Sequence, residues 1–567
     1  MSITLTIEES ELTCEGDGMS FLSLKAKLSG FLGKGQVRTI SPRLFSLPLT
    51  AAASAVSIFK EELGFVPDVL SEQDRVYKDH SNARNEAMSI ISEKRISPLE
   101  LPWPEKLDEA QAIAVSAMIT PSLKGLCLFD EQGIGKTVTA IAAFDVLHQR
   151  DEADCLVVVC PVTMKEGWRS EIEKFLPGKY NIAVLEGSRE ENRTVVLASH
   201  SFDVLICNFE SVEPLLVPLK GVLSQRKAIL VVDESFNVKN KEAVRAEAVR
   251  ELRRSCFKGF VLCGTPAPNS SIDVINQYDI ADDGYTFAGF VSPKDEDDRR
   301  ERINQRIEER GTTIRRLKEE VLPDLPDKHF HIVSVTMTGR QATMYEEGRS
   351  KLELSLKSMD NATFKRSLAT YFQQRNTLLQ VCACPEAIDT LFTDASAKLV
   401  ALDSLVNDIV EEKGKKLIIW SFYRASLSSL MRRYARYSPV LLDGSTTAKE
   451  RAEAVKRFQN DPSVRICIAN PAAAGAGVTL HAASDAAYIS YSNQAAHFLQ
   501  SIDRIHRRGQ IAPMTDYHLF VCRGTIEEGE VQRLREKEVR QNRLLGDKVK
   551  WPNSLDDALA ELTPEKL

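Results

Sequence analysis

The sequence LCLFDEQGIGKTVTAIAA, residues Leu126–Ala143, decides the fold of this chain. An apolar stretch typical of a buried strand leads into a glycine-rich turn, and a helix-forming segment follows. Gly133 and Gly135 allow backbone N–H groups to approach an anion closely, and the start of the helix adds partial positive charge. The stretch therefore predicts a phosphate-binding loop in which Lys136 contacts the β- and γ-phosphates of a nucleotide and Thr137 binds a magnesium ion.

The loop departs from the pattern G-x-x-x-x-G-K-[ST] at one position, because Asp130 stands where the first glycine is usual. Taken alone, it could also be a glycine-rich helix entry that binds no ligand. The sequence ILVVDESF, residues Ile229–Phe236, adds an apolar strand that ends in two carboxylates. Such a strand places them at the carboxyl edge of the sheet, beside the phosphate loop. We therefore expect Asp233 to hold magnesium through water and Glu234 to orient and deprotonate the attacking water.

Composition limits the class of protein. With 567 residues and 43% hydrophobic content the chain can bury several cores, which predicts three or four domains. It contains no run of about 18 apolar residues, and MSITLTIEES lacks the basic and apolar regions of a signal peptide. Eleven cysteines without a C-x-x-C pair predict reduced, buried thiols in a cytoplasmic protein without a zinc site. The net charge of −7 gives no general attraction to nucleic acid, although basic residues concentrated in one cleft would still bind it.

Strand-like runs alternate with helical segments twice along the chain, which predicts two α/β layers. In the first half we expect strands at Cys127–Phe129, Leu156–Cys160, Val195–Ala198, Val204–Cys207, Ile229–Val232 and Gly259–Cys263. In the second half we expect them at Lys416–Ser421, Pro439–Leu442, Val464–Ala469, Ala486–Ser490 and Thr515–Phe520. From Ala281 to Ala395 strands nearly vanish, and the charged run DEDDRRERINQRIEERGTTIRRLKEEV (295–321) predicts an exposed, salt-bridged helix.

Further segments follow in order: LDEAQ (107–111), VVCPVTMKEGWRSEIEKF (158–175), ICNFESV (206–212), LCGTPAPNS (262–270), IRRLKEEVLPDLPDK (314–328), LLDGSTTAKERAEAVKRF (441–458), AAAGAGVTLHAASDAAYIS (472–490) and QSIDRIHRRGQ (500–510). With these segments the chain resembles a Swi/Snf-type ATPase of helicase superfamily two over most of residues 105–545. The segments at 314–328 and at the end of the series distinguish this family from the DEAD-box RNA helicases.

The resemblance implies an α/β fold of two tandem RecA-like lobes, each a parallel sheet flanked by helices, with a helical insertion between them and a small α+β N-terminal domain. We expect an accessory domain at 1–100, an ATP-binding first lobe at 101–280, a helical insertion and linker at 281–395, a second lobe at 396–530 and a C-terminal helical brace at 531–567. The accessory domain resembles the HARP-type substrate-recognition domain of annealing helicases. The alternative is a plain packing domain that stabilises the first lobe.

In the first lobe the resemblance implies two further groups of site residues. Gln111 resembles the glutamine that hydrogen-bonds the adenine edge, and an amide can read adenine because it offers both a donor and an acceptor. Its alternative is a residue on the surface of a helix. Gly264, Thr265 and Pro266 resemble the loop that links the state of ATP to the DNA track.

In the second lobe, Arg504 and Arg507 resemble the two arginine fingers of the family. They are three residues apart in a segment expected to be helical, so they would lie on one face and reach a phosphate together. The alternative is a solvated basic helix face. Gly475 and Gly477 resemble the loop of this lobe that senses nucleotide and DNA.

The implied activity is that of an ATP-dependent duplex-DNA translocase with Mg²⁺ as cofactor, in which Lys136, Glu234, Arg504 and Arg507 are catalytic. It would displace proteins or remodel branched DNA. Its partner would be duplex or forked DNA, bound through phosphates without sequence preference, by a monomer. We expect it in the cytoplasm of a bacterial or phage-infected cell, at the nucleoid and not at a membrane.

Two alternatives stay open from the sequence: a helicase that separates DNA or RNA strands, and a relative that binds nucleic acid without catalysis. The intact catalytic residues argue against the second. Phe236 stands where relatives usually carry a histidine that helps couple ATP hydrolysis to movement. We therefore expect this coupling to be looser here or to use other residues. Short insertions and the lack of a histone-reading module argue against nucleosome remodelling.

Overall fold

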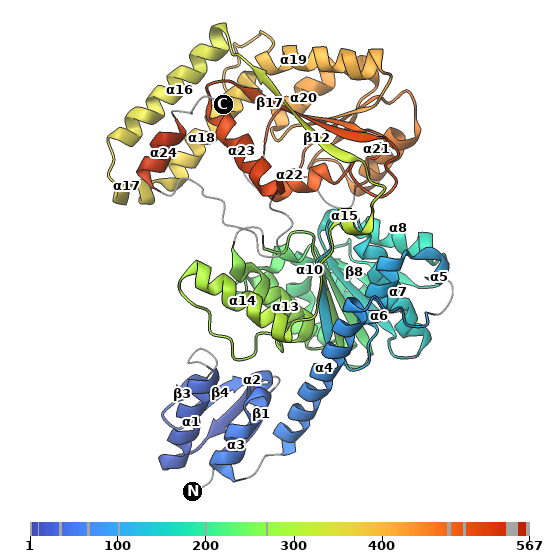
Figure 1. Cartoon of the computed structure of the whole chain (residues 1–567), viewed down its shortest axis with the longest axis vertical. Helices are drawn as coiled ribbons and strands as arrows, with labels where there is room; N and C mark the ends of the chain where they lie inside the picture. Colours follow the sequence, from blue (N-terminus) through green and yellow to red (C-terminus); the bar gives the residue numbers. More distant parts are fainter. Residues whose placement is uncertain are drawn as a thin grey trace. The chain divides into compact units, whose positions relative to one another are not determined.

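A computed structural model describes residues 3–8, 11–32, 37–64, 68–99, 103–198, 201–267, 270–472, 478–491, 495–539 and 554–562 (Figure 1). They form two compact units. The first holds residues 1–131 and 135–317, and the second holds residues 132–134 and 318–567. No described helix is both long enough and apolar enough to cross a membrane.

The first unit begins with an antiparallel sheet of four strands in the order β1-β2-β4-β3. The strands are β1 (Thr4–Glu8), β2 (Glu11–Glu15), β3 (Arg38–Ser41) and β4 (Leu44–Pro48). Helices α1 (Gly18–Leu32), α2 (Leu49–Ser54) and α3 (Val56–Leu63) share its apolar core. The long helix α4 (Asp68–Ser92) then contributes Ala83, Ala87 and Ile90 to the next core of the same unit. The small α+β N-terminal fold is therefore confirmed.

The main sheet of the first unit is parallel, with strand order β11-β5-β10-β9-β6-β8-β7. Its strands are β5 (Gly125–Leu128), β6 (Cys155–Cys160), β7 (Ile182–Val184), β8 (Val204–Asn208), β9 (Ala228–Asp233), β10 (Lys258–Leu262) and β11 (Thr313–Ile314). Every residue of the central strands is buried, as expected for a parallel sheet covered on both faces.

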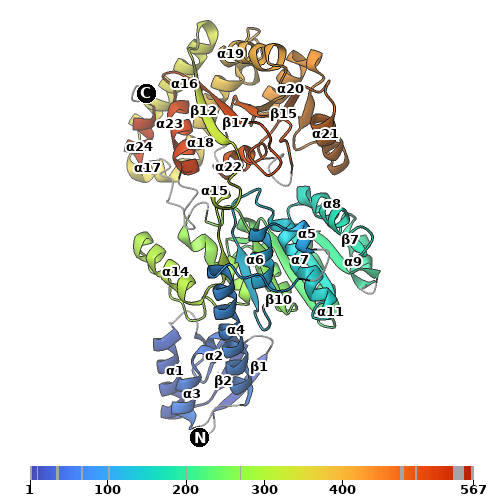
Figure 2. The ribbon, with the colours of Figure 1, turned by 45° about the vertical axis from the view of Figure 1, so that its right-hand side comes forward.

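Helices cover both faces of this sheet. They are α5 (Trp103–Lys106), α6 (Glu109–Met118), α7 (Lys136–Gln149), α8 (Lys165–Phe175), α9 (Arg189–Leu197), α10 (Phe209–Val212), α11 (Leu216–Leu223), α12 (Val244–Arg253), α13 (Ile275–Asp282) and α14 (Glu296–Arg310). The helices α6, α7 and α8 lie on one side of the sheet and α13 on the other (Figures 1 and 2).

The second unit contains another parallel sheet, in the order β12-β17-β16-β13-β15-β14. Its strands are β12 (Asp327–Val335), β13 (Leu417–Trp420), β14 (Val440–Leu442), β15 (Ile466–Ala469), β16 (Asp485–Tyr488) and β17 (Met514–Cys522). The surrounding helices are α15 (Lys318–Val321), α19 (Ala397–Val406), α20 (Arg424–Arg433), α21 (Ala448–Asn460), α22 (Ala495–Ile502) and α23 (Ile526–Val539). Two parallel sheets flanked by helices confirm the predicted fold class.

A helical subdomain belongs to the same unit. It consists of α16 (Gly339–Lys357), α17 (Asn361–Arg366), α18 (Leu368–Ala383) and the late helix α24 (Leu555–Glu561). Their apolar residues form one core together with the end of β17. A buried ion network supports it, because Arg375 of α18 donates to Glu530 of α23 and Glu561 of α24.

The predicted strand at Val195–Ala198 is wrong, because these residues fall in and directly after α9. Ser188 and Glu191 form a reciprocal capping box at the start of this helix, with each side chain accepting from the other residue's backbone N–H. This local signal outweighs the β-branched pair that follows. The strand that lies between β6 and β8 in the sequence is β7, and it precedes α9.

The expectation that strands nearly vanish from 281 to 395 is also wrong, because the nine-residue β12 lies there. It is an edge strand with largely polar, partly exposed side chains, so it lacks the apolar run of a buried strand. The charged run at 295–321 is not one exposed helix either. Ile303 and Ile307 of α14 are buried, and the helix ends at Arg310 before β11 joins the first sheet.

All eleven cysteines are buried and unbridged, which confirms the expected buried thiols. Burial raises the pKa of Cys14, Cys207 and Cys256 to about 12, so these thiols stay protonated at neutral pH.

Candidate functional site

The predicted phosphate loop connects the end of β5 to the first turn of α7. Gly133 has φ of 90° and Gly135, at the helix N-cap, has φ of 111°. Both values favour glycine strongly. A Cβ at Gly135 would also lie 2.3 Å from Nε2 of Gln111, so any side chain there would displace the loop or the glutamine. Conformation and close packing together explain this glycine.

Lys136 is the first residue of α7, and its ammonium points back into the loop. Nζ donates to the carbonyl oxygens of Asp130 at 2.7 Å and Glu131 at 3.1 Å. Thr137, the next residue, is half-buried. The loop thus gathers an ammonium, a hydroxyl and the N-terminus of a helix, which is a suitable environment for an anion.

The acidic pair lies at the same edge of the sheet as this loop. Leu262 of β10 pairs with Leu128 of β5 on one side and with Asp233 of β9 on the other. The strands are parallel, so the loop after Leu128 and the carboxylate of Asp233 emerge level with each other, one strand apart.

Asp233 and Glu234 are 4% and 3% exposed. Oδ2 of Asp233 accepts from the indole N–H of Trp168 at 2.9 Å, and Oδ1 accepts from the backbone N–H of Glu234 at 2.8 Å. Burial, followed by the nearby charge of Glu234, raises the pKa of Asp233 to about 7. Glu234 is held at φ of 50°, an uncommon backbone conformation for a residue with a side chain.

Two buried carboxylates and a threonine hydroxyl fit a magnesium ion. These are hard oxygen donors, and a divalent cation offsets the repulsion that raises the pKa of Asp233. Trp168, which orients the carboxylate, is absent from the sequence-based list of site residues. Its signal was a lone tryptophan on the amphipathic helix segment after the second strand.

Gln111 is 3% exposed, so it is not a residue on the surface of a helix. It forms a capping box with Asp108, in which its backbone N–H donates to Oδ1 of Asp108 at 2.7 Å. In return its Oε1 accepts from the backbone N–H of Asp108 at 3.1 Å. The amide therefore packs against the phosphate loop at Gly135 while its oxygen caps the start of α6.

The predicted coupling loop, Gly264–Pro266, follows β10. A buried amide connects it to the acidic strand, because Ser235 donates to Oε1 of Gln277 and Nε2 of Gln277 donates to the carbonyl of Pro266. The hydroxyl of Thr265 is buried without a hydrogen-bond partner in the part of the chain that the structure describes. Sequence reasoning missed Gln277, because α13 also carries the polar residues Asn276, Asp279 and Asp282 and no signal in the sequence distinguishes this amide.

Arg504 and Arg507 lie in an irregular turn after α22, which ends at Ile502, so the expected helix for this segment is wrong. A residue distant in sequence stabilises this turn, because the backbone N–H of Leu480 donates to the carbonyl of Arg504 at 3.0 Å. Both guanidinium groups nevertheless meet at one atom. Nη1 of Arg504 lies 3.1 Å and Nη1 of Arg507 lies 3.3 Å from the carbonyl oxygen of Val478.

We call residues 503–507 the arginine turn. Arg504 is buried, so it does not belong to a solvated basic face. Val478, which both arginines contact, directly follows the predicted sensing loop. Gly475 and Gly477 of that loop lie outside the described residues.

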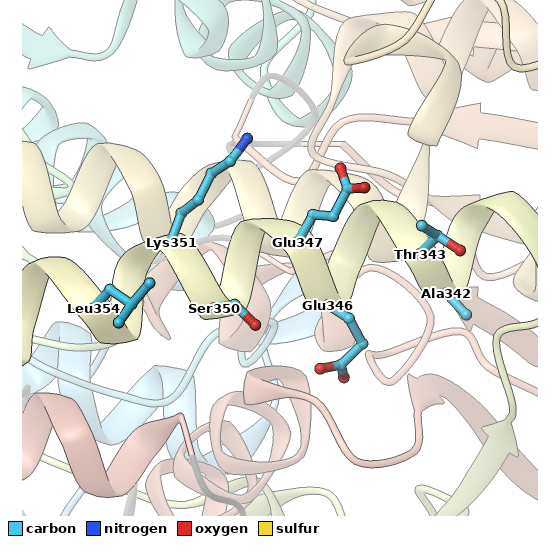
Figure 3. A pocket seen from close by; sticks show the side chains of 7 residues that line it. All are labelled: Ala342, Thr343, Glu346, Glu347, Ser350, Lys351 and Leu354. Atoms are coloured by element: carbon cyan, nitrogen blue, oxygen red, sulfur yellow. The ribbon is translucent and has the colours of Figure 1, made fainter.

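An open hollow of 610 Å³ runs along α16, far from these residues in sequence (Figure 3). Its lining consists of Ala342, Thr343, Glu346, Glu347, Ser350, Lys351 and Leu354, all from one helix. The side chains point away from one another and not toward a common centre (Figure 3). This arrangement does not resemble a site with convergent polar groups.

Comparison with known proteins relates the two parallel-sheet regions of the chain to one family. Residues 103–387 match the model described as SNF2-related domain, and residues 397–509 match that described as helicase conserved C-terminal domain. The ISWI chromatin-remodeling complex ATPase ISW2 of Saccharomyces cerevisiae is 26% identical over 440 residues, which are 72% of this chain and 38% of that protein. An uncharacterized ATP-dependent helicase of Mycoplasma pneumoniae is 24% identical over 444 residues, 76% of this chain and 41% of that protein.

Among solved structures, the Sulfolobus solfataricus SWI2/SNF2 ATPase core in complex with dsDNA aligns with 22% identity and a TM-score of 0.35. The alignment covers 81% of this chain and 97% of that one. The chain spans about two fifths of the length of the curated relatives it matches.

Proposed function

The chain belongs to the SNF2-related family of nucleic-acid-dependent ATPases, and from this premise we propose that it couples ATP hydrolysis to movement along duplex DNA. The movement would displace bound proteins or remodel branched DNA. The observation that carries the ATPase part is the register of the first sheet, which aligns Leu128, before the phosphate loop, with Asp233, at the end of the acidic strand. The similarity to ISW2, a chromatin-remodeling complex ATPase, supports DNA as the track.

In this proposal each residue of the first unit has a separate task. Lys136 binds the β- and γ-phosphates, and the loop N–H groups around Gly133 and Gly135 cradle them. Thr137 and Asp233 hold magnesium, which neutralises charge on the phosphates when bound. Glu234 accepts a proton from the attacking water, a role that suits a buried carboxylate at the end of the acidic strand.

Further residues complete the nucleotide site. Gln111 contacts the adenine through its amide N–H₂ group, since its oxygen is engaged with Asp108. Arg504 and Arg507 contact the γ-phosphate as charge develops on it, and Gly477 contacts the nucleotide. A guanidinium suits this role because it stays charged and forks onto two oxygens.

Coupling to DNA would run through Gly264, Thr265 and Pro266. The Ser235–Gln277–Pro266 hydrogen bonds connect this loop to the acidic strand, so a change around Glu234 reaches the loop within two side chains. Contacts to DNA would be made to phosphates. We therefore expect weak sequence preference and strong salt dependence.

The domain limits given above, with lobes at 101–280 and 396–530, the insertion at 281–395, the N-terminal domain at 1–100 and the brace at 531–567, are part of the proposal. So are a monomeric state on DNA and a place at the nucleoid.

Steady-state ATP hydrolysis tests the function directly. The full chain is assayed without nucleic acid and with single-stranded DNA, duplex DNA, forked DNA or RNA, and Glu234→Gln serves as control. Strong stimulation by duplex DNA that is lost in the control supports the translocase, and triplex displacement then measures movement. A larger response to forks supports branched DNA as substrate. Stimulation by single strands or RNA alone contradicts duplex tracking and supports the strand-separating helicase.

A further inference from the structure

The segment IRRLKEEVLPDLPDK (314–328) has no task in the function proposed above, yet the chain passes from the first unit to the second inside it, between Leu317 and Lys318. Two ion pairs flank this passage, one partly buried and one fully buried. One is made by Arg316 within the first unit and the other by Lys318 within the second.

Arg316 pairs with Asp130, the residue that replaces the first glycine of the phosphate-loop pattern. The backbone N–H and Nε of Arg316 donate to Oδ1 of Asp130 at 3.0 and 3.1 Å, and Nη2 donates to Oδ2. Nη1 donates to the carbonyl of Ala110, next to Gln111, and the backbone N–H of Glu131 donates to the carbonyl of Arg316 at 3.0 Å. Arg316 thus holds the start of the phosphate loop and the helix that carries the glutamine.

Lys318 is held equally firmly by the arginine turn. Its Nζ donates to Oδ1 of Asp503 and, at 2.6 Å, to the carbonyl oxygen of His506. The side chains of Lys318 and Asp503 are 3% and 4% exposed. Asp503 directly precedes Arg504 and His506 directly precedes Arg507, so the ammonium contacts the backbone or side chain beside each arginine.

A second contact comes from the same segment. Nε2 of His506 lies 2.9 Å from the carbonyl oxygen of Pro326, so residues 318–326 contact the arginine turn at two points. A lysine suits the first point because one compact ammonium can donate both to a carboxylate and to a carbonyl. It also neutralises Asp503, which would otherwise attract the neighbouring guanidinium groups away from a phosphate.

We propose that Lys318 is a positioning residue for the arginine pair, and that residues 316–318 connect the phosphate loop to the arginine turn through two ion pairs separated by a single residue. The inference rests on the proposed role of Arg504 and Arg507. A change in the nucleotide loop at Asp130 is transmitted to the arginine turn along three consecutive residues of backbone. In this role Lys318 acts through the arginine turn and not on the substrate itself.

The test is DNA-stimulated ATP hydrolysis by the full chain carrying Lys318→Met. We expect kcat to fall about 100-fold, as for a misplacement of about 1 Å in a catalytic group. The KM for ATP stays within about twofold, because ATP binding uses the phosphate loop and not the arginine turn. A loss of ATP binding with unchanged kcat overturns the proposal.

Lys318→Met leaves a buried carboxylate without its partner and could unfold the chain, so Lys318→Met/Asp503→Leu is the second variant. It buries no unpaired charge, and we expect it to melt near the wild-type temperature while its kcat stays clearly below that of wild type. A wild-type kcat in this folded double variant overturns the proposal.

Lys398→Met is the matched control. Lys398 is also a buried lysine of the second unit, and it pairs with Glu527 and donates to the carbonyl of Ile489 at 2.8 Å. We expect a similar loss of thermal stability, with kcat per folded molecule within about twofold of wild type.

Arg504→Ala and Arg507→Ala distinguish the proposed role of the arginines from the positioning role of Lys318. If both hydrolyse ATP like wild type, the proposed role of the arginines fails. If both are impaired while Lys318→Met/Asp503→Leu is not, only the positioning role of Lys318 fails. Adding Arg507→Ala to the double variant should cause less loss than the two effects multiplied, because both act on one group.

Discussion

The phosphate loop, whose flanking strand and helix belong to the first unit, and the arginine turn of the second unit are built in opposite ways. Regular elements fix the loop, since β5 leads in, α7 leads out and the sheet register aligns it with Asp233. Remote contacts fix the arginine turn, namely Val478, Lys318 and Pro326. A short sequence pattern is enough to predict the first kind of site. The second depends on side chains and carbonyls that a local pattern does not contain.

The largest effect is expected from the arginine turn. Arg507→Ala should lower kcat about 1,000-fold, because the guanidinium stabilises charge that develops only in the transition state. Binding of ATP to the first unit should remain, and a fluorescent ATP analogue measures it alongside kcat. Equal loss of ATP binding and kcat would contradict the assignment of ATP binding to the phosphate loop and of transition-state stabilisation to the arginine turn.

Asp130→Gly tests the phosphate loop by restoring the usual glycine. It removes the carboxylate that pairs with Arg316, whose side chain is largely buried. We expect a destabilisation of about 3 kcal/mol, because a buried charge loses its partner. Urea denaturation gives the value, with Arg300→Ala, which breaks a more exposed pair on α14, as control. A gain in stability would show that the ion pair between Asp130 and Arg316 does not stabilise the phosphate loop.

Trp168→Phe sharpens the comparison within the first unit. The variant keeps the aromatic packing and removes the N–H that donates to Asp233. Groups that orient a metal ligand are worth about 10- to 100-fold in metal affinity, and we expect about tenfold more magnesium for half-maximal ATP hydrolysis. At saturating magnesium kcat should return to within about twofold of wild type. A fall in kcat that magnesium cannot restore would contradict the orienting role.

The smallest effect concerns pH. The pKa of Asp233 is raised to about 7 in the folded, metal-free protein, above the value of an unfolded chain. Between about pH 3.8 and 7 the folded state therefore binds a proton that the unfolded state does not, so this contribution to stability is fully present below the ordinary pKa of 3.8 and is lost as pH rises from there through 7. Magnesium must displace the proton, and its apparent affinity should fall about threefold between pH 7.5 and 6.5. Asp233→Asn should abolish both dependences, and titration calorimetry measures them.

Much of this architecture could be predicted from local sequence, and the failures have physical causes. Strands with buried apolar runs were predicted because both their faces are covered. Edge strand β12 was missed because its polar side chains face solvent. Val195–Ala198 was misassigned because a capping box at Ser188 outweighs strand propensity.

The candidate site divides in the same way. Lys136, Asp233 and Glu234 follow from where strands end, whereas the contacts of Trp168 and Gln277 join residues far apart in the chain. The arginine spacing suggested a helix, but the shared contact with Val478 comes from a turn. Hydrogen bonds between residues far apart in the chain produce no periodic sequence pattern, so they could not be predicted from the sequence.

The buried cysteines have a practical consequence for watching the protein at work. With every native thiol buried, maleimide dyes should react chiefly with cysteines that are added on the surface. Ser170 on α8 and Ala452 on α21 are exposed positions in the first and second units. Fluorophores coupled to Ser170→Cys and Ala452→Cys would let single-molecule energy transfer follow the distance between the units through each round of ATP turnover.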